Sequence, residues 1–343
     1  CRSSLEVAAL IARSESMGFG MADKCIHASN PEGKMYQNVV NALASTDVSV
    51  QASALELINA LCITCPDHDH QAVLDQHLEA LNMAATMRNI VKAVQDEKLK
   101  LQCYIYQALK LRRLAKLKET TYDKTNPQHE ETLMSLWKYT FPDVALSGRI
   151  SEQWKVMGFQ GTDPSTDFRG MGFLGLKNLV YFASQHGDEY RALMNRNIER
   201  KERDYPAAVA GINITQMLFE CLNAGKPINF NGPPLKLFRV IFDNPTAFEE
   251  IYCKCFTLLD AMWDQMNASY MDFPKVSAAI KKQLEHALSL NPSTVEAFCG
   301  AMTGDVSSAM SGGGSDFSGK SADHPQMKAI RLAIHKEVTD MVL

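Results

Sequence analysis

Apolar residues recur at helical spacing along most of this 343-residue chain, and no other sequence feature constrains its fold as strongly. Within residues 50–63, one face follows the i, i+3, i+4, i+7 pattern of an amphipathic helix, with Ala54, Leu57, Ile58 and Leu61. Hardly any stretch shows the two-residue alternation of a half-buried strand. We therefore expect an all-α protein.

Helical segments follow one another closely in the first 119 residues. Segments 34–45, 50–63 and 72–94 are separated only by short polar breaks. Consecutive helices joined by short turns are typical of an α-solenoid, in which each helix pair buries its apolar face against the next pair. This pattern predicts helical repeats over residues 1–119.

Residues 96–119 combine helical spacing of apolar residues with several lysines and arginines. A basic amphipathic helix can lie on an anionic membrane surface or dock on an acidic partner. The alternative is a connecting helix whose lysines point into water, and we favour this interpretation.

The polar, turn-rich segment 120–128 marks a domain boundary. Further helical patterns follow at 129–139, 151–157, 172–186, 207–222, 235–242, 246–268, 275–288 and 294–302. Residues 303–325 are rich in glycine and serine and are predicted to be a flexible linker, with a C-terminal helix at 326–343. We predict two main domains, at 1–119 and 128–302.

Charge and cysteine content narrow the class of protein. The formal net charge of −4 leaves no basic excess for coating a nucleic acid, so no nucleic-acid partner is expected. No apolar run reaches the roughly 20 residues that a membrane helix needs. The nine cysteines lie mostly within helical patterns and are predicted to be reduced core residues. The chain opens at Cys1 without a signal peptide, so we expect a fragment of a longer cytoplasmic protein.

Few residue combinations could support catalysis or metal binding. One cluster offers two thiolates and two imidazoles, but it lacks the widely separated pairs of a structural zinc site: Cys62, Cys65, His68 and His70. Cys253 and Cys255 fall within one helix and point to different faces, which indicates packing. No Ser/His/Asp, HExxH or P-loop pattern appears, so no metal, cofactor or intrinsic catalytic chemistry is expected.

Residues 154–183 are the most informative stretch for function. The pattern predicts a short helix, a loop containing Asp163-Pro164, and a second helix that opens after Gly172. An Asp-Pro pair favours a turn, and the glycines of the loop permit tight backbone geometry. The sequence therefore places a structured loop between two helices.

Arg169 lies in this loop between Phe168, which is expected to anchor in the core, and Gly170, which leaves room for a partner. A planar guanidinium held in this way can enter another protein's phosphate site and stabilise charge on a transferring phosphoryl group. The alternative is a local ion pair of Arg169 with Asp163 or Asp167, and the residue types alone favour it.

The stretch 154–183 closely resembles the signature of the ELMO (engulfment and cell motility) domain. The resemblance spans about residues 128–300 and continues through His129-Glu-Glu-x-Leu133, Leu136-Trp137, Ile150-Ser-Glu-Gln-Trp154, Ala210-Gly-Ile-Asn-Ile-Thr215 and Trp263-x-x-x-Asn267-Ala-Ser-Tyr270-Met-Asp-Phe273. The earlier helices, especially residues 47–66, look like the armadillo-type segment of full-length ELMO proteins. The resemblance implies armadillo-like repeats over 1–119 followed by a helical ELMO domain over 128–302.

The family resemblance implies two alternative functions. Large armadillo-containing ELMO proteins are scaffolds that bind Dock-type Rac exchange factors and relay phagocytosis and motility signals to the actin cytoskeleton. Shorter ELMO-domain proteins are GTPase-activating proteins for Arf and Arl GTPases, through the arginine of an Asp-Phe-Arg-Gly stretch that matches Asp167–Gly170 here. This chain combines the layout of the first group with the motif of the second.

We therefore expect a small-GTPase regulator, with the scaffold as the leading hypothesis. In the alternative, Arg169 is an arginine finger, Asp163 and Asp167 orient its loop, and the binding residues are Trp154, Gln160, Phe168 and Gly170. The expected partners are a small GTPase, a Dock-type exchange factor and receptor cytoplasmic tails. The resemblance also implies a cytoplasmic protein that its partners recruit to membranes.

Overall fold

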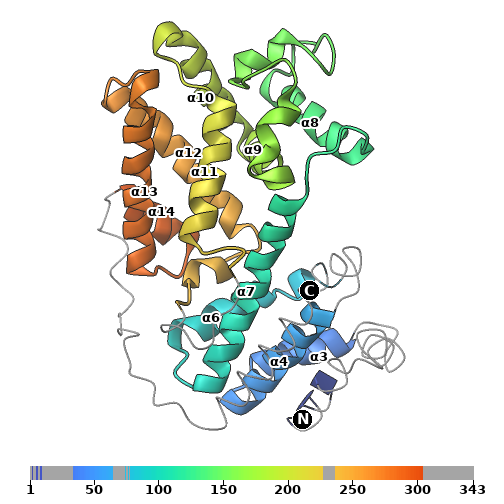
Figure 1. The fold of residues 1–343 in the computed structure, drawn as a ribbon. Helices are drawn as coiled ribbons and strands as arrows, with labels where there is room; N and C mark the ends of the chain where they lie inside the picture. Colours follow the sequence, from blue (N-terminus) through green and yellow to red (C-terminus); the bar gives the residue numbers. More distant parts are fainter. Residues whose placement is uncertain are drawn as a thin grey trace. The chain divides into compact units, whose positions relative to one another are not determined.

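A computed structural model of the chain describes residues 2, 5, 6, 8, 9, 34–64, 74, 76, 78–226 and 236–303. All regular secondary structure in this part is helical, and it contains no strand, which confirms the all-α fold (Figure 1). The linker and terminal helix predicted at 303–325 and 326–343 lie outside the described residues, apart from Thr303.

The chain forms two compact units. The first contains the described parts of residues 1–110 and 226–245, and the second contains the described parts of 111–225 and 246–309. The division falls within helix α7 (Glu97–Glu119). These units reflect contacts in the folded chain, so the domains at 1–119 and 128–302 remain a prediction.

The first unit is built from α3 (Lys34–Leu43), α4 (Val48–Thr64), α6 (Met83–Ala93), the first part of α7, and the 3-10 helix η4 (Arg239–Phe242). The predicted apolar face of α4 is buried throughout, at Ala54, Leu57, Ile58 and Leu61. In the core, the Asn59 amide donates to the carbonyl of Gln102 at 3.0 Å and to its side-chain oxygen at 2.9 Å. This pair joins α4 to α7 because a buried amide needs hydrogen-bond partners.

The basic residues of α7 make contacts within the protein. Lys98 pairs with Glu56 at 3.1 Å, and Lys110 Nζ donates to the carbonyl of Ile241 at 2.8 Å. Lys118 lies 4.7 Å from the centre of the Phe219 ring. The interpretation of α7 as a helix whose lysines simply point into water is therefore wrong for these three residues, since each is used to hold the fold together.

The second unit contains the remaining helices. The α-helices are α8 (Pro127–Thr140), α9 (Gly172–Gln185), α10 (Gly187–Glu199), α11 (Ala207–Cys221), α12 (Ala247–Gln265), α13 (Phe273–Leu290) and α14 (Val295–Thr303). The 3-10 helices are η1 (Glu152–Met157), η2 (Pro164–Arg169), η3 (Lys201–Arg203) and η5 (Tyr270–Asp272).

Helix α9 packs against α8, α10, α11 and α12 (Figure 1). Phe182 on α9 meets Tyr190 of α10 and Phe256 of α12 at ring-centre distances of 5.1 and 5.7 Å. Helix α11 approaches α12 closely at Gly211, where a Cβ atom would lie 2.6 Å from the Tyr252 hydroxyl. This aromatic core supports the segments that carry the charged residues described below.

The main helices of the second unit fall where the sequence predicts them, but α10 is missing from that prediction. Its inward face is short, with Tyr190, Leu193 and Met194, and its other positions are mostly polar. The helix predicted at 235–242 is only the single turn of η4 in the described residues. Among the helices that the structure describes, none has the length and apolar character needed to cross a membrane.

Candidate functional site

The loop that carries Arg169 is a short 3-10 helix of six residues, η2, with a capped start. The Asp163 side chain accepts hydrogen bonds from the backbone N–H of Ser165 at 3.0 Å and from its hydroxyl at 2.6 Å. Pro164 occupies the first helical position, where no backbone donor is needed. The Asp-Pro-Ser sequence thus fixes where the turn begins, and Arg169 is its last residue.

Packing of aromatic side chains anchors this turn to the core. The ring of Phe168 stacks on Tyr122 with centres 5.7 Å apart and meets the edge of Phe159 at 5.8 Å. Phe159 in turn contacts Trp154 at 5.7 Å. Trp154 and Phe168, predicted as binding residues, are 0% and 1% exposed, so in this structure they anchor the loop from the core. Gln160 and Gly170, predicted with them, lie at the surface.

Arg169 itself is exposed. Within the described part of the chain, its guanidinium makes no hydrogen bond or ion pair, so the predicted local pair with Asp163 or Asp167 is absent. Asp163 pairs instead with Arg149 at 2.8 Å, and Asp167 Oδ2 accepts the backbone N–H of Gln160 at 3.2 Å. A cation in this position remains available to a partner.

The two acidic residues of the loop have opposite pKa shifts. Burial raises the pKa of Asp163, but hydrogen bonds from Ser165 and Arg149 outweigh it and leave that pKa below its usual value. Burial raises the pKa of Asp167, and the Gln160 N–H and the charge of Arg169 oppose the rise without cancelling it. Asp163 therefore stabilises the loop in its charged form, whereas burial of Asp167 works against its charge.

Glycines shape the end of the loop. Gly170 has no atom within 4 Å of the position that a Cβ would take, which leaves open space beside Arg169. Gly172 has a φ of 53°, and a Cβ there would lie 2.1 Å from the carbonyl oxygen of Lys118. The adjacent Phe173 N–H donates to the carbonyl of Thr120 at 2.8 Å. The chain after the loop is thereby fixed against the end of α7.

A residue outside the predicted set completes the site. Arg149 donates from Nε to both carboxylate oxygens of Glu130 at 3.0 and 2.8 Å, and from Nη1 to Asp163 at 2.8 Å. This role of Arg149 could hardly be predicted from the sequence, because its partners lie 19 and 14 positions away. The only local signal is its place next to Ile150, where one of the ELMO-like segments starts.

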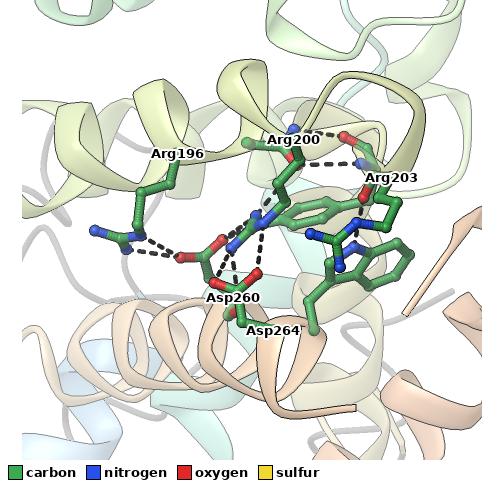
Figure 2. Close-up of polar contacts among 8 residues, drawn as sticks. Arg196, Arg200, Arg203, Asp260 and Asp264 are labelled. Atoms are coloured by element: carbon green, nitrogen blue, oxygen red, sulfur yellow. Dashed lines mark hydrogen bonds and ion pairs between the residues drawn. The ribbon is translucent and has the colours of Figure 1, made fainter. Parts of the chain in front are cut away.

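A second arginine cluster joins α10 to α12. Figure 2 shows Arg196 and Arg200 directed at Asp260, with ion-pair distances of 2.6 Å for each. Asp260 is 1% exposed and also accepts the hydroxyl of Tyr205 at 2.9 Å. Arg200 makes a further ion pair with Asp264 at 2.6 Å.

The same cluster fixes the chain between α10 and α11. The Trp263 indole donates to the carbonyl of Arg203 at 2.7 Å, and Arg203 bonds the side chain of Asn267. Both oxygens of Asp260 are bonded, and Arg200 is 6% exposed. The buried Arg200 and Asp260 satisfy each other's charge and so serve the fold, while Arg196 and Asp264 are about half exposed at the edge of the cluster.

The sequence of this region identifies the family. Residues 112–277, which contain both arginine clusters, match the sequence model described as the ELMO/CED-12 family. This chain belongs to the ELMO/CED-12 family. The ELMO-like residues of the loop and of α12 therefore lie within a genuine ELMO domain.

Similar proteins carry the same domain. The chain is 38% identical to ELMO domain-containing protein A of Dictyostelium discoideum over 288 residues, which cover 74% of this chain and 30% of that protein. It is 35% identical to ankyrin repeat and ELMO domain-containing protein D of the same organism, covering 74% of this chain and 20% of that protein. It is 40% identical to human ELMO domain-containing protein 2 over 149 residues, which cover 43% of this chain and 48% of that protein. This ELMO-domain chain thus spans less than half the length of each of these relatives.

The cysteines described by the structure are free thiols, in agreement with the predicted reduced state: Cys62, Cys103, Cys221, Cys253, Cys255 and Cys299. Burial raises the pKa of the Cys103 thiol to about 12, so it is not a reactive thiolate. The described residues hold no group of three or more His, Cys, Asp or Glu that could bind a metal. In the zinc-like cluster, Cys65, His68 and His70 lie outside the described residues, and Cys62 is buried in α4.

Proposed function

We propose that this ELMO domain stimulates GTP hydrolysis by a small GTPase of the Arf or Arl family, with Arg169 entering the partner's phosphate site. The observation that carries the proposal is the state of the Arg169 side chain. It is exposed and unpaired within the described chain, while Asp163, one of its two predicted partners, is paired with Arg149. The structural alternative, a local ion pair of Arg169 with Asp163 or Asp167, is therefore not formed in the described chain.

The surroundings of Arg169 suit insertion into a partner. The buried Phe168 and the capping Asp163 order the turn before any partner arrives, which reduces the entropy lost on binding. Gly170 leaves the approach open. An arginine supplied in trans accelerates GTP hydrolysis by about 10³- to 10⁵-fold, because its planar guanidinium stabilises charge on the transferring phosphoryl group.

Single-turnover GTP hydrolysis tests this proposal. Arf and Arl GTPases loaded with GTP are mixed with excess wild-type chain, Arg169→Lys or Arg191→Lys. We expect the wild type and Arg191→Lys to accelerate at least one GTPase equally, and Arg169→Lys to lose about 10³-fold or more of that acceleration. Arg191 is a matched control because it lies on α10 and already has a local partner in Asp188. Equal acceleration by wild type and Arg169→Lys would exclude an arginine finger.

A scaffold function is the second candidate, and the extent of the sequence similarity favours it. The similarity to Dictyostelium protein A covers 74% of this chain, more than the matched residues 112–277, and so extends into the helices around the ELMO domain. By the family resemblance, such an arrangement would hold a Dock-type Rac exchange factor at membranes and act on actin, motility and phagocytosis. The first-unit helices would then be the surface for receptor tails.

Binding experiments separate the two candidates. A scaffold should bind a Dock-type exchange factor or a receptor tail equally well as wild type and as Arg169→Lys, with no acceleration of GTP hydrolysis. If neither binding nor acceleration is found, both proposals are wrong for this chain.

A further inference from the structure

Arg149 bonds two carboxylates that hold the Arg169 loop: Asp163, which caps the start of η2, and Glu130, which bonds the tyrosine packed on its end. We infer that Arg149 is a positioning residue, which holds the η2 turn in place and occupies the carboxylates that would otherwise attract Arg169. This inference rests on the proposed role of Arg169 in GTP hydrolysis. Its direct physical claim, that Arg149 keeps Arg169 unpaired, concerns this chain alone.

The first support is the start of the turn. Arg149 Nη1 donates to Asp163 Oδ1 at 2.8 Å, and the same oxygen accepts the Ser165 N–H that begins η2. The backbone around Arg149 is also fixed, since its carbonyl accepts the Trp154 indole N–H at 3.0 Å. Arg149 thus fixes the cap of the turn from a rigid position.

The second support is the end of the turn. Arg149 Nε donates to Glu130, whose Oε1 also accepts the Tyr122 hydroxyl at 2.6 Å. The Tyr122 ring stacks on Phe168, the residue before Arg169, and lies 5.8 Å from the Arg149 guanidinium. One guanidinium therefore connects to both ends of η2, and a lysine could not span these partners because it lacks the planar fork.

Arg149 also engages a carboxylate that could otherwise pair with Arg169. Asp163 is half-buried, precedes Arg169 by six residues, and is engaged by Arg149 instead. If Arg149 were neutral, Asp163 and Glu130 would both lack their cation, and the inference is that Arg169, on the same turn as Asp163, would then pair with Asp163. Arg149 Nη2 is itself buried without a hydrogen-bond partner in the described chain, so the pairing with Asp163 and Glu130 is made at the cost of one unsatisfied donor.

The test compares three variants of the full chain. Arg149→Gln removes the cation. Asp163→Asn removes the rival carboxylate but keeps the turn capped, because asparagine is an equally good N-cap residue. The double variant Arg149→Gln/Asp163→Asn removes both. Arg149→Lys is a further variant that keeps the charge if loss of the cation prevents folding, and thermal unfolding confirms that each variant is folded.

The first readout is the NMR signal of the Arg169 Nε–Hε group in the chain alone. We expect Arg149→Gln to shift and rigidify this signal as Arg169 pairs with Asp163. Asp163→Asn should leave it as in the wild type, and the double variant should restore most of the wild-type signal. An unchanged Arg169 signal in folded Arg149→Gln overturns the inference, whether or not any GTPase is stimulated.

The second readout is stimulated GTP hydrolysis as a function of chain concentration. We expect Arg149→Gln to lower the saturating rate about 10- to 100-fold, as misplacing a catalytic group by about 1 Å does. The half-saturating concentration should change much less than the saturating rate, since the inference assigns Arg149 a role in positioning and none in partner contact. A full saturating rate in Arg149→Gln rejects the positioning role, whereas absence of stimulation by the wild type rejects only the proposed function.

Discussion

The ELMO domain of this chain contains two arginine clusters that use charge in opposite ways. Between α10 and α12, Arg196 and Arg200 are both bonded to the buried Asp260, each through one of its two carboxylate oxygens (Figure 2). At the η2 loop, Arg149 is paired while Arg169 stays exposed and unpaired in the described chain. The first cluster is bonded within the fold, and the unpaired Arg169 of the second is the feature on which the proposed contact with a partner GTPase rests.

The largest stability effect is expected at the closed cluster, the ion pairs of Arg196 and Arg200 with Asp260 and Asp264. Asp260→Ala leaves Arg200 buried without its main partner, and breaking such a pair costs about 3–5 kcal/mol of unfolding free energy. Urea denaturation measures this loss. The control is Asp264→Ala, whose carboxylate is 51% exposed and which should cost about 1 kcal/mol or less. Equal losses in the two variants would remove the distinction between a buried and a surface charge.

The next effect tests how firmly the Arg169 loop is held. Gly172→Ala forces an L-residue to a φ of 53° and places a Cβ against the Lys118 carbonyl, so we expect a loss of at least about 2 kcal/mol. Gly170→Ala, with open space around the Cβ position, should change stability by less than about 0.5 kcal/mol. Thermal unfolding of the two variants compares them, and equal stabilities would show that the loop is not anchored at Gly172.

Acid pH should weaken the closed cluster. The hydrogen bond from Arg200 lowers the pKa of Asp264 below its usual value. A carboxylate with a lowered folded-state pKa contributes stability above its unfolded-state pKa, and this contribution is lost as pH falls below about 4. Unfolding free energy measured from pH 6 to pH 2 should therefore fall less steeply for Asp264→Asn than for the wild type. Parallel pH curves would contradict this assignment.

The smallest effect is expected at Asp167, and it has the opposite sign. Burial raises the pKa of this carboxyl, so its charged form costs stability at pH values above its folded-state pKa. Asp167→Asn should raise the unfolding free energy at pH 7 by about a few tenths of a kcal/mol. The difference should vanish as pH falls below the unfolded-state value near 3.8. A destabilised variant at pH 7 would mean that the Asp167 charge supports the loop.

Local patterns in the sequence predict the loop well. The all-α fold, the helix opening at Gly172, and the burial of Phe168 follow from apolar spacing and turn residues. The partners of charged side chains do not follow in the same way. Arg149 reaches Glu130 and Asp163 only because the folded chain brings separate segments together, whereas the sequence predicted a pair of Arg169 with Asp163 or Asp167.

The closed cluster was harder to predict for the same reason. Arg196 and Arg200 bond a residue about 60 positions away, and α10 itself has few apolar residues to mark it as a helix. The ELMO-like pattern around Trp263 indicates the family but does not indicate which arginines Asp260 pairs with. Pairing over such separations depends on how α10 and α12 pack.

The central claim is that Arg169 acts on a partner and contributes nothing essential to the fold. Single-turnover hydrolysis of GTP by a responsive Arf or Arl GTPase, at saturating chain concentration, tests it most directly. We expect Arg169→Lys to unfold at the wild-type temperature yet to lose about 10³-fold or more of the acceleration. An Arg169→Lys chain that accelerates hydrolysis as fast as the wild type would contradict it.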